Sequence, residues 1–256
     1  MLIEQRLEFL DSLPNLPQTN KGRIRAFADQ VPVNPGETKG NGSGAMSEQT
    51  FNLYVPGMAE QNKKDVNNCR LLVQNAATQK YDPNTQMKQW YTHYTETMSK
   101  LGWIIQASQT RDQVIKQSGL TMDAVAVYVL QGLVGANFPT LAAVAKNAVE
   151  AVKNNDGLID LYNRKSHVGS DEKFDISPAW ETTEGYPMMI MNCSSLDVRE
   201  SSRGILFWKS TSQETKIVTA AHAMYLNLEV YSQIRNDVLK KIGNAAKGAL
   251  EELPDL

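Results

Sequence analysis

The sequence predicts an α+β fold, with a main body that follows a glycine-rich stretch at 40–46. Three observations predict this class. Helical periodicity fills the first half of the body, short apolar runs with strand character fill the second half, and a last helical pattern closes the chain. We therefore expect helices with a central apolar hairpin, then a small antiparallel sheet, then a C-terminal helix.

The composition is that of a globular protein, and it excludes several classes of function. A chain of 256 residues with 41% hydrophobic residues can bury a substantial core. A formal net charge of −2, without a basic run, argues against nucleic acid as a partner. The 2 cysteines and 3 histidines lack metal-binding spacing, so we expect no metal and no cofactor. Oligomeric state leaves no signal in the sequence.

The glycine-rich stretch predicts a division of the chain. Residues 40–46 (GNGSGAM) have the composition of a flexible linker, and Gly-Ala-Met before a polar start is typical of an engineered junction. We interpret 1–39 as a partner-like peptide segment, fused to a single α+β body at 47–256. A natural mobile loop is the alternative. The helical part of the body is expected at about 58–165, and its sheet and final helix at about 172–252.

The leading segment has too few apolar residues to build a core of its own. A short helix is predicted at its start, ended by Pro14 and Pro17. Charges interrupt the apolar residues of this N-terminus, so we expect a cytoplasmic protein, or one exported without a cleaved signal peptide. We expect the apolar side chains of the segment to dock on the body, with these anchors: Leu7, Phe9, Leu10, Ile24 and Phe27.

The first elements of the body are a strand at 51–55 and a helix from about 59 to 78. Asp82 and Pro83 predict the start of a second helix, and Gly102 predicts its end. Apolar and aromatic residues repeat along this second helix at intervals of three and four. Its aromatic row is interpreted either as core or as a ligand groove: Trp90, Tyr91 and Tyr94.

An uncharged stretch at 124–145 is the most distinctive feature of the body. Its glycines, asparagine and proline predict a turn between two helices, at about 122–134 and 140–153, with Thr140 as the second N-cap. The hairpin is interpreted either as a buried centre of the fold or as a segment that enters a bilayer, as in α-helical pore-forming toxins. The membrane interpretation assigns it these residues: Val125, Val127, Val129, Leu130, Leu133, Val134, Leu141 and Val144.

The second half of the body predicts strands and a final helix. A near-continuous apolar run at about 186–198 is typical of a buried strand, and 204–209 with 215–226 predicts a hairpin. From Asn227 onward a helical face is predicted, made of Val230, Ile234, Val238 and Ile242.

Cys193 and His222 form the best candidate for catalysis. A nucleophile needs a base that a third group orients, and Asp197 or Glu214 is the candidate for that third group. Cys193 lies in a methionine-rich run, however, which favours a core position. The catalytic assignment is therefore none, with this pair as a weak alternative.

The sequence thus leaves three hypotheses in order. The first is a non-catalytic protein-binding or peptide-binding module, such as a chaperone, an adaptor or a secretion-associated partner. It would hold an extended segment like 1–39, or the parent protein of that segment, in an apolar groove. The second is a membrane-inserting helical pore-forming toxin or virulence factor that uses the hairpin. The third is a cysteine-dependent hydrolase.

Overall fold

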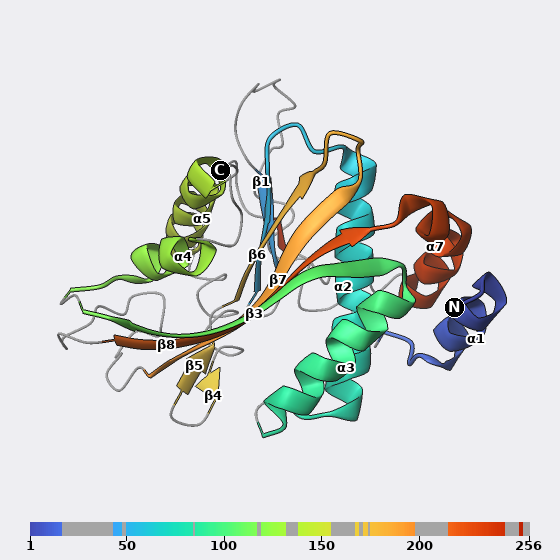
Figure 1. Ribbon diagram of the computed structural model, residues 1–256, viewed down its shortest axis with the longest axis horizontal. Helices are drawn as coiled ribbons and strands as arrows, with labels where there is room; N and C mark the ends of the chain where they lie inside the picture. The colour runs from blue at the N-terminus through green and yellow to red at the C-terminus, as the bar shows by residue number, and fades with distance from the viewer. Residues whose placement is uncertain are drawn as a thin grey trace.

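A computed structural model describes residues 1–16, 43–47, 50–83, 85–116, 119–131, 138–154, 167–168, 171–173, 175–197, 215–243 and 251–252. Its fold is α+β, as the sequence predicts. A central sheet has helices on both faces, and the two groups of helices lie on opposite sides of it in Figure 1.

The described strands form a 9-stranded mixed sheet, in which β3-β8-β7-β6-β2-β1-β9 is the main order. The strands of this path are β1 (Ser43–Ser47), β2 (Thr50–Tyr54), β3 (Trp103–Ile115), β6 (Asp175–Glu181), β7 (Pro187–Asp197), β8 (Thr215–Leu226) and β9 (Glu251–Glu252). Two short strands, β4 (His167–Val168) and β5 (Asp171–Lys173), extend from β7. The sheet is larger than expected, and it is not purely antiparallel, because β2 pairs with β6 in parallel.

The longest strand that the sequence did not predict is β3, which lies inside the part expected to be helical. It pairs with β8 from Trp103 opposite Leu226 to Ile115 opposite Thr215, with an irregularity between Ile105 and Ala107. β8 lies between β3 and β7. The partner that the sequence predicts for β8, at 204–209, lies outside the described residues.

Residues on β7 alternate between two cores, because successive strand residues point to opposite faces. Ile190 belongs to one cluster of buried residues, whereas Met189 and Met191 belong to the other. The first cluster lies under α4 (Met122–Leu130) and α5 (Phe138–Lys153). The second lies under α2 (Glu60–Lys80), α3 (Met87–Lys100) and α7 (Leu228–Ile242).

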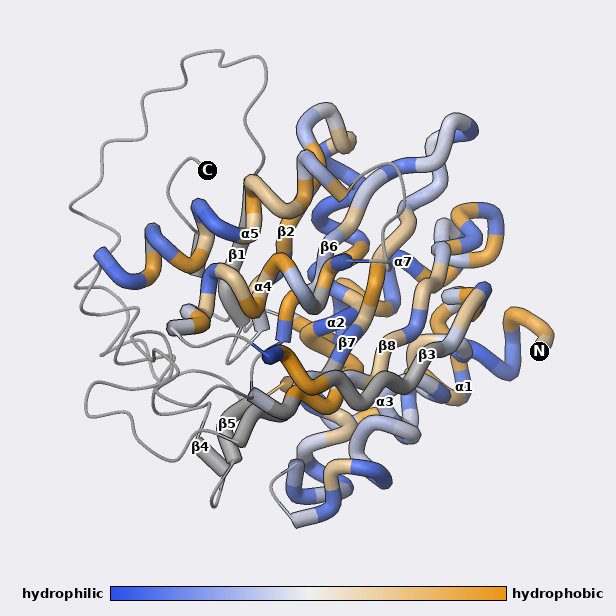
Figure 2. The backbone as a smooth tube through the Cα atoms, turned by 60° about the vertical axis from the view of Figure 1, so that its left-hand side comes forward, coloured by the Kyte–Doolittle hydropathy of each residue, from blue (hydrophilic) through white to orange (hydrophobic). Residues whose placement is uncertain are grey.

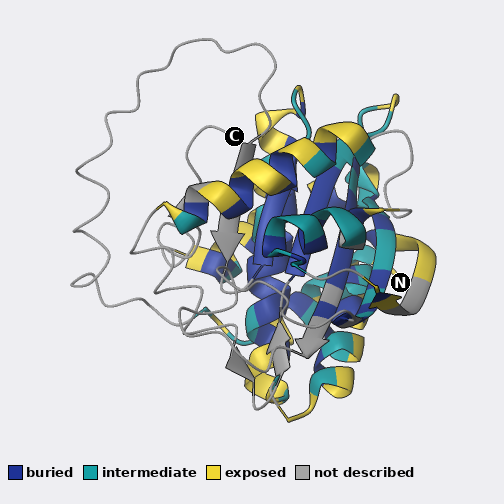
Figure 3. Cartoon of the chain, turned by 90° about the vertical axis from the view of Figure 1, so that its left-hand side faces the viewer, coloured by how far each residue is buried: buried dark blue, intermediate teal, exposed yellow. Residues whose placement is uncertain are grey.

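The predicted helical hairpin is present as α4 and α5, which pack against each other. Lys153 Nζ lies 3.4 Å from Asp123 Oδ1 and joins the outer ends of the two arms. Helix α5 begins at Phe138, before the expected cap Thr140, since a proline at 139 fits a first helical turn. Apolar residues dominate the hairpin in Figure 2. In Figure 3 the exposed residues of α5 face away from the buried sheet.

Helices α2 and α7 follow the expected stripes. Val66, Cys69, Val73 and Ala77 of α2 are all buried. Helix α3 begins at Met87 rather than at the predicted Asp82–Pro83 start. Thr85 Oγ1 donates to Asp82 Oδ2, and the amide of Gln86 donates to the carbonyl of Asp82, so Asp82 opens a turn that precedes the helix.

The second half of the expected linker is a strand. Ser43–Ser47 forms β1, which pairs with β2 from Ser43 opposite Tyr54 to Ser47 opposite Thr50. β1 also pairs with β9 on its other side, and the composition of the stretch alone does not reveal this backbone pairing. The interpretation of 1–39 as a fused segment stays a prediction.

Candidate functional site

The N-terminal helix α1 (Ile3–Ser12) packs against α7, although the two are far apart in sequence (Figure 1). The amide of Leu2 donates to Gln5 Oε1 at 3.0 Å, which satisfies one of the free N–H groups at the helix start. The helix ends before Pro14, which would remove a backbone donor from any continuation. Leu10 is only 1% exposed, and Leu13, just beyond the helix, is 6% exposed.

Leu10 and Leu13 belong to the buried cluster on the α2, α3 and α7 side of the sheet. Ile3, Leu7, Phe9 and Leu16 pack against the same cluster as half-buried residues. Polar contacts from α2, the end of α3 and α7 also reach this segment. We call its partners on the body the α1-binding surface: Asn75, Ala76, Ser99, Lys100, Ile234, Val238, Lys241 and Ile242.

A buried ion pair joins two of the helices that carry this surface. Arg235 of α7 donates to both carboxylate oxygens of Asp65 on α2, with Nη2 at 2.7 Å from Oδ2 and Nε at 3.0 Å from Oδ1. The Asp65 side chain is fully buried, whereas that of Arg235 keeps 28% of its exposure. The Asp65 contact raises the pKa of Arg235. A two-point contact of this kind fixes α2 and α7 relative to each other.

The end of α3 is fixed to the start of α7. Gly102 has φ of 103°, in the left-handed region that favours glycine, and its carbonyl accepts from the amide of Asn227 at 3.0 Å. Asn227 Oδ1 in turn accepts from the amide of Val230 at 3.1 Å, which is the helix cap that the sequence predicts. The body thus orders the α3 terminus by contacts that do not involve α1.

Two surface hollows border α1. One, of about 500 Å³, lies between α1, α2 and α3 and is lined in part by Phe9, Leu13, Lys80, His93 and Lys100. The other, of about 440 Å³, lies between α1 and the α3 and β3 side. Burial, and then the charge of Lys80, lowers the pKa of His93. Lys100 Nζ lies 4.3 Å from the centre of the Phe9 ring, a cation–π contact across the rim.

The structure separates the predicted anchors. Leu10 is buried, and Leu7 and Phe9 are half-buried against the body. Ile24 and Phe27 lie outside the described residues. Leu13 was not among the predicted anchors, although it follows Leu10 at helical spacing, because Pro14 predicts the end of the helix at this point.

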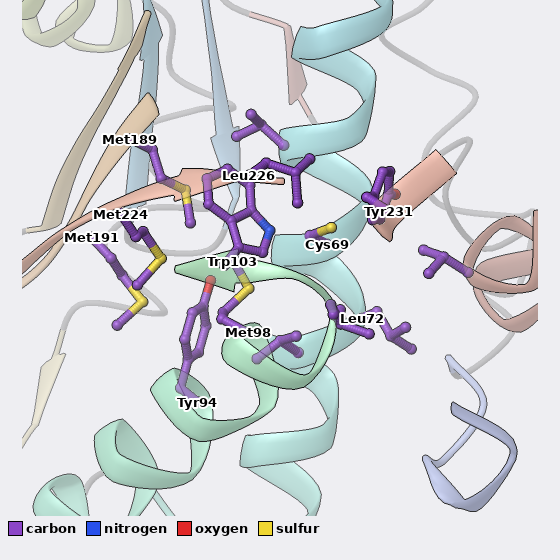
Figure 4. Packing of buried hydrophobic residues seen from close by; sticks show 14 of the residues in the cluster. Cys69, Leu72, Tyr94, Met98, Trp103, Met189, Met191, Met224, Leu226 and Tyr231 are labelled. Carbon is purple, nitrogen blue, oxygen red and sulfur yellow. The ribbon is translucent and has the colours of Figure 1, made fainter. Parts of the chain in front are cut away.

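The aromatic row of α3 does not form an open groove. Trp90 and Tyr94 are buried in the core, and Trp90 Nε1 donates to Thr78 Oγ1 at 3.0 Å. Tyr91 is half-buried, and its hydroxyl lies 3.2 Å from the carbonyl oxygen of Ala220. These rings face α2 and the sheet because α3 covers the sheet edge at this point. The methionines that share this core with Tyr94 are visible in Figure 4.

Cys193 and His222 lie on neighbouring strands, with Met191 opposite His222 and Cys193 opposite Ala220. The side chain of Cys193 is outside the described set. His222 Nδ1 lies 2.7 Å from Ser108 Oγ, and its ring stacks on Tyr91 with a centroid distance of 5.3 Å. Burial lowers the pKa of His222.

Among the residues that the structure describes, Asp197 does not serve as the expected third group of a catalytic triad. Asp197 is six residues along β7 from Met191, which is about 20 Å of strand and too far to orient His222. Glu214 lies outside the described residues. Within the part that the structure describes, no three His, Cys, Asp or Glu side chains gather where a metal ion would bind.

Of the residues assigned to a membrane hairpin, most of those that the structure describes are buried in the core. Val125, Leu130, Leu141 and Val144 belong to the core under α4 and α5, and Val127 is half-buried. The side chain of Val129, and all of Leu133 and Val134, lie outside the described set. Among the described residues, every helix is too short or too polar to cross a bilayer.

The fold and the site define an α+β protein with helices on both faces of a mixed sheet and an N-terminal helix docked on one side. No protein-family model matches the chain, and no curated protein sequence matches it. Among solved structures, the Evf virulence factor is similar with 14% identity and a TM-score of 0.37, over 98% of this chain and 91% of that chain. A delta-endotoxin is similar with 12% identity and a TM-score of 0.37, over 78% and 96%. Likenesses of this size carry no functional conclusion.

Proposed function

We propose that the body is a non-catalytic module that binds an amphipathic helix, and that α1 occupies its binding surface. Chaperones, adaptors and secretion-associated partners bind segments in this way. The burial of Leu10 and Leu13 in a core otherwise made by the body is the observation that carries the proposal.

Few side chains attach α1 to the body. Burial of a leucine contributes about 1.5–3 kcal/mol, and only Leu10 within the helix itself is fully buried. Among the described residues of this core, those of α2, α3, α7 and the sheet also contact one another directly, without α1. A tether raises the local concentration of such a segment to about millimolar, so α1 stays bound in the intact chain, and a competing helix displaces it when the tether is cut.

Cutting the tether in the full-length protein tests this proposal. A protease site is inserted within 17–39 and cleaved, and a fluorescent peptide of residues 1–16 is added. We expect saturable binding by fluorescence anisotropy, and competition by the unlabelled peptide.

A matched peptide gives the control. Leu10→Asp places a charge at the buried anchor and is expected to abolish binding, whereas Leu2→Asp changes a residue that is 70% exposed and is expected to bind normally. A cleaved protein that takes up no labelled peptide over several days, or that binds both peptides equally, contradicts the proposed function.

A second candidate function is membrane insertion by the α4–α5 hairpin. The two helices of the hairpin follow each other in the sequence. The core between the hairpin and the sheet is separate from the core under α2, α3 and α7. It is therefore able to leave the sheet as one layer while the other core stays intact. Since neither arm is long enough to span a bilayer alone, insertion requires this rearrangement.

Leakage of a dye from lipid vesicles tests the second candidate. Val144→Lys charges a residue that faces the sheet, whereas Ala143→Lys makes the same change at an exposed neighbour. Membrane insertion predicts that the unchanged protein releases the dye, that Ala143→Lys does so too, and that Val144→Lys does not. Intact vesicles at every lipid composition and pH would remove this candidate.

A further inference from the structure

We infer that the α1-binding surface selects its ligand through contacts at helix carbonyl ends, and so prefers helices that carry an arginine directly before the first of three spaced leucines. This inference rests on the proposed function and adds the chemistry of the partner. The ligand class is an amphipathic helix with the pattern Arg-Leu-x-x-Leu-x-x-Leu, which Arg6, Leu7, Leu10 and Leu13 supply here.

The first contact is made by Arg6 on the end of α3. Arg6 Nη1 donates to the carbonyl oxygen of Lys100 at 2.5 Å and to that of Ser99 at 3.3 Å. The last carbonyls of a helix have no partner within the helix and carry its partial negative charge. Helix α3 ends at Lys100, and the Ser99 oxygen also accepts from the amide of Gly102 at 3.2 Å, so the Lys100 oxygen is the main acceptor for the Arg6 cation.

The second contact runs in the opposite direction, from the body to the ligand. Lys241 Nζ, in the last turn of α7, donates to the carbonyl oxygen of Asp11 at 2.9 Å. Helix α1 ends at Ser12, so this oxygen belongs to its free carbonyl end. Asn75 Nδ2 adds a longer contact of 3.4 Å to the carbonyl oxygen of Asn15.

The two contacts together fix the direction of the bound helix. A reversed helix would move its carbonyl end away from Lys241 and its arginine away from the end of α3. Apolar burial alone is non-directional and does not distinguish the two orientations. The carbonyl contacts therefore supply the polarity that Leu10 and Leu13 do not.

Arg6 depends on these carbonyls for its electrostatic stabilisation. Within the described part of the chain no carboxylate pairs with it, and burial lowers its pKa. Both contacts come from Nη1, whose two N–H donors lie in the rigid plane of the guanidinium, whereas lysine acts as a single point charge on a flexible stem. An exposed acidic residue on the same helix, such as Glu8, has no part in the contact.

The cleaved full-length protein and labelled 1–16 peptides test the inference. Arg6→Ala is expected to weaken binding about tenfold or more, since a hydrogen bond to a charged group is lost. Arg6→Lys is expected to recover part of the affinity. Glu8→Gln, which changes the charge by one unit in the opposite sense at an exposed site, is expected to bind within a factor of about two of the unchanged peptide.

Two further measurements separate the inference from the proposed function. A peptide with the sequence 1–16 reversed keeps its composition and is expected not to bind. Lys241→Met in the protein keeps an apolar stem and is expected to weaken binding of the unchanged peptide several-fold. If the unchanged peptide binds but Arg6→Ala and the reversed peptide bind equally well, the inference is overturned and the proposed function stands. If the unchanged peptide does not bind, both are overturned.

Discussion

The two faces of the central sheet are covered in different ways. Under α4 and α5 the buried core is aliphatic apart from Phe51, with small residues such as Ala126, Ala145 and Ala148 among its members. Under α2, α3 and α7 it contains tryptophans, tyrosines and methionines, and polar contacts such as Asp65–Arg235 cross it. Figure 4 shows Trp103 between Met98, Cys69 and Leu226 in this second core.

The two faces therefore differ in the interactions that determine which segments pack on them. The hairpin face relies on shape and apolar area, and one segment of the chain supplies its cover. The other face collects segments from both ends of the chain, and directional contacts set their positions. The second face is therefore suited to accept an added helix, and α1 lies at its edge.

The largest expected effect is the loss of the buried ion pair. Arg235→Ala leaves the fully buried Asp65 carboxylate without its cationic partner, and we expect the free energy of unfolding to fall by about 3–5 kcal/mol in urea titrations. Asp237→Ala removes the partner of Lys240, whose side chain is 76% exposed, and is expected to cost less than about 1 kcal/mol. Equal effects of the two changes would show that the ion pair does not organise the second face.

On the hairpin face, Leu130→Ala is expected to lower the free energy of unfolding by about 2–5 kcal/mol, because it leaves a cavity at a residue with no exposure. Leu239→Ala, at a leucine that is 43% exposed on α7, provides the comparison and is expected to have a much smaller effect. A loss below about 1 kcal/mol at Leu130 would contradict close packing of the hairpin on the sheet.

At Leu10 a smaller effect is expected than at Leu130, although both side chains are buried. If α1 detaches from its surface while the body stays folded, the lost free energy cannot exceed that of α1 binding. Leu10→Ala is therefore expected to lower the free energy of unfolding by less than about 2 kcal/mol. Urea titration of both variants in parallel compares the two. A loss at Leu10 as large as that at Leu130 would indicate that α1 is an integral part of the core.

The smallest expected effect is on pH dependence. Burial lowers the pKa of both His93 and His222 from the ordinary 6.5, so the unfolded chain binds protons more readily than the folded one. Above about pH 6.5 both histidines are neutral in the folded and the unfolded chain, and stability is at its full value. As the pH falls below that, the unfolded chain takes up protons first, and the folded state loses stability. Between pH 7.5 and 5.5 we expect a smaller loss of stability in His93→Gln/His222→Gln than in the unchanged protein. A larger loss in the double variant would reverse the assigned direction.

Elements with a clear apolar period were predictable from the sequence. The stripe of Ile234, Val238 and Ile242 recurs every four residues, and α7 buries all three. Strand β3 was missed because it lies at the end of the main strand order, where Ile104 and Ile105 are both exposed and do not alternate between a buried and an exposed face. The parallel pairing of β2 with β6 joins segments far apart in sequence, and no local pattern encodes it.

The sequence predicted residues of α1 that contact the body, but not the residues of the body that contact α1. Leu10, which the amphipathic leader predicts as an anchor, is buried, whereas in the aromatic row of α3 Trp90 and Tyr94 are buried in the core and Tyr91 is half-buried. The surface that receives α1 combines Asn75 and Ala76 of α2 with the end of α3 and one face of α7, so it exists only in the folded chain. Arg6 and Lys241 carry no sequence signal for their role, because both contact backbone carbonyls that every helix end possesses.

Backbone hydrogen exchange in the full-length Leu10→Asp variant tests the central claim most directly, namely that the body forms its binding surface whether or not α1 is bound. The account predicts that amides of α1 lose their protection, while those of α2, α3 and α7 exchange as slowly as in the unchanged protein. Fast exchange throughout α2 and α7 would contradict it, since α1 would then hold those helices together.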